Sequence, residues 1–265
     1  MKISLYTMIL PRLEVFFLEE WIQHHLNLGV DEIYLYNSGN KPFRECGGFR
    51  NRPKDLRSLN SEEQNIKWGK KPDADYFLEF SDSEINDKLN EIVMTYKNNV
   101  FLKSWVSRID HNETKNVNSQ ITGYRDAVSR SYDGWWMLLD PDEFLYSPSF
   151  DSIRDFLVDS ENNKNYNIRL SQRVFNCRKP DYEVRRIFDY CGDLSLSKSF
   201  IKNPILNELK VHTGKTMLSD EQRINKNQFR FNHYRGPSEQ MGGPAYGKLM
   251  YKPFDKIDEG MLKYM

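Results

Sequence analysis

Gly134-Trp-Trp-Met-Leu-Leu-Asp140-Pro-Asp142-Glu-Phe-Leu145 is the stretch of this 265-residue chain that carries the clearest structural signal. Its five consecutive large apolar residues are too few for a typical helix but suit a strand buried on both faces, as in a parallel sheet. Open α/β sheets bind their ligands at the carboxyl ends of such strands. Here three carboxylates follow the apolar run within four residues, so the stretch predicts a ligand site at a strand end.

Two of these carboxylates, Asp140 and Asp142, alternate along the chain and are expected to point the same way, with Pro141 stiffening the turn. Converging carboxylates repel unless a cation lies between them or one is protonated. Mg²⁺ and Mn²⁺ meet that need, because they commonly bind one or two protein carboxylates together with phosphate oxygens. A bare Asp-x-Asp is usually a solvated acidic turn, but the buried, tryptophan-rich strand before it favours a site for a divalent ion and a diphosphate.

The overall composition excludes several classes of protein. Basic and acidic residues balance at 38 each, so the chain lacks the basic footprint of a protein that binds nucleic acid. Its cysteines, Cys46, Cys177 and Cys191, lack metal-site spacing and suit reduced thiols. The apolar N-terminal segment is interrupted at Pro11, too early for a membrane helix, and no small-residue cleavage site follows it. The sequence therefore predicts a soluble, cytoplasmic protein and leaves its oligomeric state open.

The first half of the chain alternates between strand and helix patterns. These patterns predict strands at 3–10, 30–36, 100–106 and 135–139, and helices at 14–28, 84–98 and 117–131. This order implies right-handed βαβ crossovers and a parallel sheet. Residues 41–80 are polar and broken by prolines, which suggests a surface insertion that acts as a lid or faces an acceptor.

The second half of the chain has a looser and more antiparallel pattern. We expect a helix at 151–158, capped by Ser149 or Asp151, and strands at 166–175, 194–202, 209–213 and 228–234. No linker separates the halves, so the prediction is one α/β domain over residues 1–265.

Some polar residues within these elements admit more than one interpretation. In the first helix, His25 is expected to pack in the core and His24 to lie on the surface. Lys198 flanks an apolar strand and is either solvated or available to neutralise a diphosphate. For His212, a structural or acceptor-site role is favoured. A histidine such as His233, on an apolar strand, is on its own more often a core residue than a ligand.

Four short motifs follow one another along residues 3–240. The first is Leu18-Glu-Glu-Trp-Ile-Gln-His-His-Leu-Asn-Leu-Gly-Val-Asp-Glu-Ile-Tyr-Leu-Tyr36. The second joins Gln120-x-x-x-Tyr124 to Trp136-x-x-x-Asp140-x-Asp142-Glu143-Phe144. The last two are Lys210-Val-His212 and Phe231-Asn-His233-Tyr234. Together and in this order they resemble the glycosyltransferases of the GT-A fold that are similar to families 2 and 92.

The resemblance implies a Rossmann-like GT-A domain with a mostly parallel central sheet and a mixed or antiparallel C-terminal half. Residues 1–143 would bind the nucleotide-sugar and residues 144–265 the acceptor. The implied activity is that of a metal-dependent hexosyl- or pentosyltransferase of glycan biosynthesis, using Mn²⁺ or Mg²⁺. Its donor would be a nucleotide-sugar, a UDP-sugar before a GDP- or dTDP-sugar, and its acceptor a glycan.

The resemblance also implies roles for individual residues. Asp140 would contact the donor ribose or the metal, Asp142 would ligate the ion that bridges the diphosphate, and His233 would be a distal ligand of the metal or the diphosphate. The remaining nucleotide contacts would come from the strand exits and the third helix, at Thr7, Met8, Arg12, Asn37 and Arg125.

Sugar transfer with inversion needs a general base to deprotonate the acceptor hydroxyl. The candidates are Asp181, Glu183, Asp189 and Asp193, and none of them lies in a recognisable motif. Retaining chemistry would need no separate base; the resemblance favours inversion. Two alternatives stay open. A nucleotidyltransferase or phosphosugar enzyme would ordinarily have a Gly-rich loop before Asp140, which is absent, and a silent carbohydrate-binding protein would be expected to have lost one acid of the Asp140/Asp142 pair.

Overall fold

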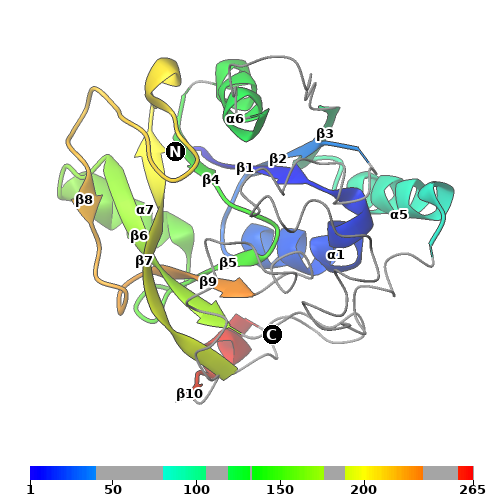
Figure 1. Cartoon of the computed structure of the whole chain (residues 1–265). Helices are drawn as coiled ribbons and strands as arrows, with labels where there is room; N and C mark the ends of the chain where they lie inside the picture. Colours follow the sequence, from blue (N-terminus) through cyan, green and yellow to red (C-terminus); the bar gives the residue numbers. More distant parts are fainter. Residues whose placement is uncertain (40–79, 106–118, 132, 176–188, 235–255, 265) are drawn as a thin grey trace, which may run out of the picture.

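The computed structural model describes residues 1–39, 80–105, 119–131, 133–175, 189–234 and 256–264. The predicted insertion at 41–80 lies outside these ranges, apart from its last residue. Within the described ranges the chain forms a single α/β arrangement built on one mixed sheet (Figure 1).

The sheet runs in the order β3-β2-β1-β4-β7-β6-β9-β5, with β10 paired to β7 and β8 paired to β6. Strands β1 to β4 are parallel to one another, and β7 joins β4 in the antiparallel sense. The predicted parallel first half and mixed second half are therefore confirmed. The strands are β1 Ile3–Ile9, β2 Glu32–Asn37, β3 Val100–Ser104, β4 Trp135–Leu138, β5 Glu143–Tyr146, β6 Asn167–Phe175, β7 Asp189–Lys202, β8 Gln222–Arg223, β9 Arg230–Tyr234 and β10 Lys256–Ile257.

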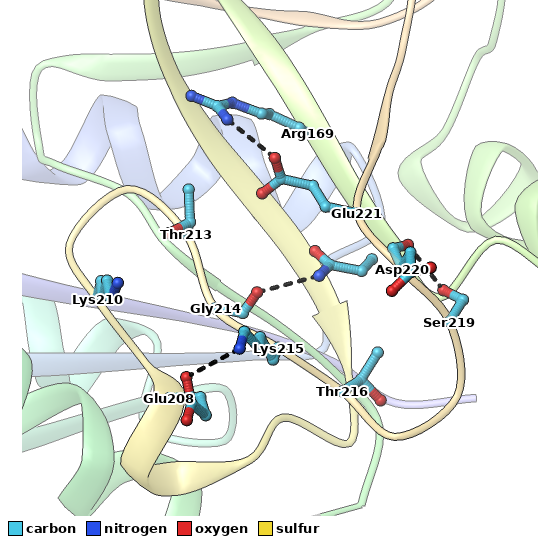
Figure 2. Close-up of a pocket in the computed structure, with 11 residues that line it drawn as sticks. Arg169, Glu208, Lys210, Thr213, Gly214, Lys215, Thr216, Ser219, Asp220 and Glu221 are labelled. Carbon is cyan, nitrogen blue, oxygen red and sulfur yellow. Dashed lines mark hydrogen bonds and ion pairs between the residues drawn. The ribbon is translucent and has the colours of Figure 1, made fainter.

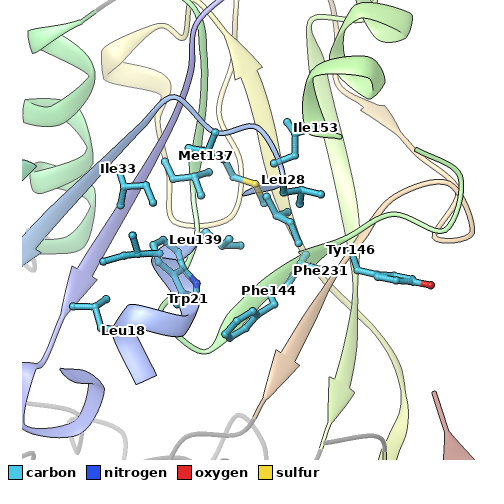
Figure 3. Close-up of a cluster of buried hydrophobic side chains, with 14 of the residues drawn as sticks. Leu18, Trp21, Leu28, Ile33, Met137, Leu139, Phe144, Tyr146, Ile153 and Phe231 are labelled. Carbon is cyan, nitrogen blue, oxygen red and sulfur yellow. The ribbon is translucent and has the colours of Figure 1, made fainter. Parts of the chain in front are cut away.

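Helices cover both faces of the parallel part of the sheet. Side chains alternate along a strand, so Leu5 of β1 joins one apolar cluster and its neighbour Tyr6 joins another. The first cluster includes residues of α1 and α5, and Figure 3 shows Leu18 and Trp21 of α1 within it. In the second cluster Tyr6 stacks on Tyr124 of α6. The helical segments are α1 Pro11–Asn27, α5 Asp82–Thr95, α6 Ser119–Arg130 and α7 Ile153–Asn162, with the 3₁₀ turns η2 Leu206–Glu208 and η3 Gly260–Tyr264.

Local sequence explains where these helices begin and end. Pro11 occupies the first turn of α1, where a missing N–H costs nothing, and Gly29 follows the helix with φ +105°. Helix α5 begins with a capping box between Ser81 and Glu84. Helix α7 is capped by Ser152, whose side chain accepts from Asp155 N–H at 3.1 Å. The predicted caps Ser149 and Asp151 were therefore wrong.

The order of the parallel strands reverses at β1. The chain adds β2 and β3 on one side of β1 and then returns to add β4 on the other side. Strand β1 pairs with β2 on one side and with β4 on the other. The backbone N–H of Leu139 still donates to Tyr6 O at 3.0 Å, so the residues that leave β1 and β4 emerge side by side. Such a switch point is where open α/β sheets bind ligands.

Helix α1 also holds β5, the last strand in the order. Trp21 Nε1 donates to Glu143 O at 2.8 Å, and His24 Nε2 donates to Leu145 O at 2.8 Å. His25 Nε2 accepts from Leu145 N–H at 3.2 Å, while its Nδ1 donates to Trp21 O at 2.7 Å. These three side chains are three and four residues apart, on one face of the helix, and they satisfy backbone groups on the edge of β5. His24 is 1% exposed, so its predicted surface position was wrong.

Three further sequence predictions differ from the structure. Residues 209–213 form no strand; they follow η2 as irregular chain in which Lys210 N–H donates to Thr213 O at 2.8 Å. Strand β7 begins five residues before the predicted strand at 194–202. Strand β5 was not predicted, because its four residues directly after a turn are too few to show a recognisable strand pattern.

Acid should destabilise this fold through His25. Burial lowers the pKa of His25 well below its ordinary value, and His24 adds to this effect. The unfolded chain therefore takes up a proton near pH ~6.5 that the folded protein refuses, and stability is lost as pH falls below that point. The wild type should lose up to about 1.4 kcal/mol per pH unit more than His25→Gln, as measured by urea unfolding between pH ~5.5 and ~8. Parallel profiles for the two proteins would contradict this.

Candidate active site at the ends of β1 and β4

The chain leaves β4 into a tight turn that ends in β5. Glu143 N–H donates to Asp140 O at 2.9 Å, and the Glu143 carboxylate accepts from Asp140 N–H at 2.9 Å. The two hydrogen bonds close the turn around Pro141 and Asp142. Because Trp21 fixes Glu143 O from the other side, the turn is anchored at both ends.

A buried cation lies against this turn. Lys198 of β7 is 1% exposed, and its Nζ lies 2.7 Å from Asp140 Oδ2 and 3.2 Å from Glu143 Oε2. Burial opposes the charged form of Lys198, but the two carboxylates outweigh that effect and raise its pKa. The other oxygen of Asp140 accepts from Gln120 Nε2 of α6 at 2.6 Å. Lys198 is therefore part of the candidate site and is not a solvated surface lysine.

Glu143 is the most deeply buried acid of the turn. Burial raises the pKa of its carboxyl group. Lys198 and His233 lower this pKa, whereas the negative charges of Asp140 and Asp142 raise it further. All four groups thus lie within electrostatic reach of Glu143. The sequence singled out the flanking aspartates, whereas the structure puts Glu143 at the centre of the charged groups.

Asp142 and His233 meet across the sheet although 91 residues separate them. Strands β5 and β9 pair antiparallel with Glu143 opposite His233, and Tyr234 N–H donates to Asp142 O at 2.8 Å. That register puts His233 Nε2 at 3.2 Å from Asp142 Oδ2. His233 is 4% exposed, and the side chain of Asp142 is 15% exposed.

The separation of this pair suits a hydrogen bond and also two ligands of one divalent ion. Ligands bonded to one ion at about 2.1 Å in neighbouring octahedral positions lie about 3 Å apart, which is close to the Asp142–His233 separation. Gln172 supports the imidazole from behind through its hydrogen bond with Nδ1, and its own Oε1 has no partner among the described residues. If the amide is turned over, Oε1 accepts from Nδ1–H and leaves Nε2 free to bind metal, as in many metal-binding histidines.

The rest of the coordination would have to come from a ligand and water. Within the described residues, no three His, Cys, Asp or Glu side chains gather closely enough to hold an ion by themselves. Mg²⁺ and Mn²⁺ sites that also bind phosphates commonly use only one or two protein groups. Asp142 and His233 fit such a site, while both oxygens of Asp140 are already engaged by Gln120 and Lys198.

The residues expected to bind the nucleotide lie on different elements, and their burial differs. Thr7 is fully buried on β1, with no hydrogen-bond partner for Oγ1 among the described residues, and Met8 beside it is half-buried. Asn37 ends β2 and accepts from Gly39 N–H at 2.8 Å. Arg125 of α6 donates to the carbonyl oxygens of Asn207 and Leu209, at 3.0 and 3.3 Å. The side chain of Arg12 lies outside the described part.

The candidate general bases remain predictions. Asp181 and Glu183 lie outside the described residues. Asp189 and Asp193 belong to β7, where their side chains are likewise outside the description.

Two contributors to the site were missed or undervalued in the sequence. Gln172, the partner of His233, carries no signal except its place on an alternating strand. Lys198 could have been found from its position between buried residues of a core strand, because a lysine there needs a carboxylate partner.

Comparison with known proteins gives matches of structure only. No family model matches the chain, and no curated protein matches it in sequence. Among solved structures, apo UDP-glucose pyrophosphorylase is 8% identical with a TM-score of 0.36, over 94% of this chain and 100% of the other. UDP-glucose pyrophosphorylase from Acinetobacter baumannii is 12% identical with a TM-score of 0.36, over 95% of both chains.

A third structure, CMP:2-keto-3-deoxy-manno-octonic acid synthetase with CTP, is 8% identical with a TM-score of 0.34, over 78% of this chain and 77% of the other. Scores and identities this low assign no activity to the chain. No described helix is both long and apolar enough to cross a membrane.

Removing the buried ammonium of the site should cost stability. Lys198→Met leaves the Asp140 and Glu143 carboxylates without their cation, and breaking a buried ion pair in this way typically costs about 3 kcal/mol or more. The matched control is Lys202→Met, which removes a quarter-exposed lysine that pairs with Glu161 at 2.9 Å and should cost less than about 1 kcal/mol. Urea unfolding followed by tryptophan fluorescence measures both, and equal losses would show that Lys198 is not the cation on which the turn depends.

Proposed function

We propose that this protein is a metal-dependent glycosyltransferase that moves a sugar from a nucleotide-sugar, a UDP-sugar in the first instance, to a glycan acceptor. The observation that carries the proposal is the Asp142–His233 pair, 3.2 Å apart, in which Asp142 belongs to the turn that follows β4 and His233 to β9. The motifs that resemble GT-A glycosyltransferases converge on the same place, since Gln120, Asp140 and His233 all contribute side chains to it.

With a divalent ion bound, the charges of the site would suit a diphosphate. The carboxylates of Asp140, Asp142 and Glu143 outnumber the buried ammonium of Lys198, so the ion would have to supply the positive charge. A divalent ion bound by Asp142 and His233 would neutralise the diphosphate and stabilise the leaving group as the glycosidic bond breaks. Lys198 holds Asp140 in place and adds positive charge behind the turn. Gln120 fixes the second oxygen of Asp140, so that this carboxylate presents one orientation to a ribose or to the ion.

The acceptor would be activated from the opposite face of the sugar. In an inverting reaction a carboxylate takes the proton of the attacking hydroxyl, and Asp181, Glu183, Asp189 and Asp193 remain the candidates for that role. Which of them acts is open to a scan of single Asn or Gln variants assayed for transfer and for donor hydrolysis.

The first test is metal-dependent nucleotide binding. Calorimetry should detect binding of UDP in the presence of Mn²⁺ and its loss in excess chelator, and a panel of nucleotide-sugars should show slow donor hydrolysis. Asp142→Asn keeps the shape of the side chain but removes its charge, so we expect the fold to persist and the hydrolysis rate to fall about a hundredfold or more. Glu91→Gln, at an exposed position on α5, is the control.

Several outcomes would contradict this proposal. Full activity in excess chelator would exclude the metal, and wild-type turnover in a folded Asp142→Asn protein would exclude the residue. Synthesis of a UDP-sugar from UTP and a sugar 1-phosphate, with no transfer to an acceptor, would favour a nucleotidyltransferase.

A second test asks whether Asp142 and His233 share one ion. His233→Ala should weaken Mn²⁺-dependent UDP binding, and the double variant Asp142→Asn/His233→Ala should be little worse than either single variant, because the ion can be lost only once. Additive losses in the calorimetric cycle would mean that the residues act separately. A lowered melting temperature with unchanged affinity would mean that His233 only packs the core.

A further inference from the structure

A polar cavity lies in the second half of the chain, apart from the Asp142–His233 pair. Its volume is about 330 Å³, at the lower end of the range for small-molecule sites, ~300–1,000 Å³. The start of β6 forms its floor and the segment 208–221 its walls, with Lys210 and Thr213 on one side and Ser219 and Asp220 on the other (Figure 2).

The walls of the cavity combine donors and acceptors with no net charge. Three cationic side chains line it, as do three carboxylates. Among them Arg169 pairs with Glu221 at 2.9 Å, and Lys215 with Glu208 at 3.5 Å. Carboxylates in the wall disfavour an anion such as phosphate. Hydroxyl groups both donate and accept, so a neutral polyhydroxylated ligand matches this lining best.

One buried polar atom in the cavity lacks a partner. Asn167 is 2% exposed and donates through Nδ2 to Gly214 O at 3.0 Å. Its Oδ1 has no hydrogen-bond partner among the described residues. Leaving a buried acceptor unsatisfied is costly, so Asn167 is a strained part of the cavity lining.

The segment that forms the cavity wall also contains two exposed apolar residues. Met217 is 87% exposed and Leu218 is 47% exposed, and in the sequence both lie between the lining residues Thr216 and Ser219. The C–H face of a sugar ring is a surface they could cover, while the ring hydroxyls reach the polar walls.

The same segment reaches back to the candidate active site. His212 is exposed, but its ring donates to the backbone of Ser197. Partial loss of solvent lowers the pKa of His212; Lys198 acts in the same direction and Asp140 against it. His212 thus lies within electrostatic reach of both residues. Its carbonyl oxygen and Glu221 Oε2 each accept from Ser199 Oγ at 3.5 Å, which ties the cavity wall to β7 next to Lys198.

We propose that this cavity binds a neutral sugar residue of the glycan acceptor, with Met217 covering its apolar face and Lys210 and Asp220 contacting its hydroxyls. The assignment to an acceptor rests on the proposed function, whereas saccharide binding itself does not. A sugar held here would place the rest of an acceptor chain toward Asp140 along the His212 segment.

Saccharide binding can be measured without nucleotide or metal. Saturation-transfer NMR and titration of the full chain with the methyl glycosides of glucose, galactose, mannose and N-acetylglucosamine should detect at least one ligand. Lys210→Ala removes one exposed wall group and Asp220→Asn removes the charge of another, and each should weaken that ligand about tenfold or more, the usual effect of losing a hydrogen bond to a charged group. Met217→Ser should weaken it about threefold, and Met94→Ser, 64% exposed on α5, should leave it unchanged.

Three results would overturn this proposal. The first is no saturation transfer from any of the glycosides. The second is binding that all three wall variants leave intact, which would place the sugar elsewhere. The third is displacement of the sugar by inorganic phosphate, which would make the cavity an anion site. Because UDP and Mn²⁺ binding are measured separately, failure here leaves the proposed donor site standing, and failure there leaves this cavity standing.

Discussion

The candidate site depends on how helix α1 holds the edge of β5. Trp21, His24 and His25 satisfy three backbone groups of Glu143 and Leu145 on β5, a strand whose one strand neighbour in the described part of the chain is β9. An unpaired strand edge buried under a helix would be costly, so these side chains replace a strand. They fix the position of β5 relative to α1. The position of β5 in turn determines where the turn with Asp142 lies and which residue of β9, His233, lies opposite Glu143.

The two aspartates of the turn solve the problem of converging negative charge in different ways. Asp140 has its counter-charge within the protein, in the buried ammonium of Lys198, and Gln120 takes its second oxygen. Asp142 faces a histidine backed by Gln172, and this is the pair that we propose receives an ion from outside. The buried ammonium of Lys198 thus stabilises the turn permanently. We propose that the charge at the Asp142–His233 pair changes when an ion binds. This division explains why the turn can be well packed before any ligand binds.

The sequence revealed the elements better than it revealed the contacts among them. The apolar run at 135–139 predicted a buried parallel strand, and β4 confirms it. This prediction needed only the residues that are neighbours along the chain. His24 was misplaced because a polar ring within a helix looks exposed until the strand edge it caps is known. The predicted strand at 209–213 was wrong. The segment is a loop, and Arg125 stabilises its start by donating to the carbonyl oxygens of Asn207 and Leu209. The meeting of Asp142 with His233 followed from motif order, but Gln172 could be found only from the register of β6 against β9.

The central claim is that Asp142 and His233 bind one divalent ion that carries a nucleotide diphosphate. A crystal structure with Mn²⁺ and UDP, using the anomalous signal of manganese, tests it most directly. We expect an anomalous peak within bonding distance of Asp142 Oδ2 and His233 Nε2, with diphosphate oxygens completing the coordination. A manganese peak elsewhere, or bound UDP with the Asp142–His233 hydrogen bond intact and no metal beside it, would contradict a shared ion.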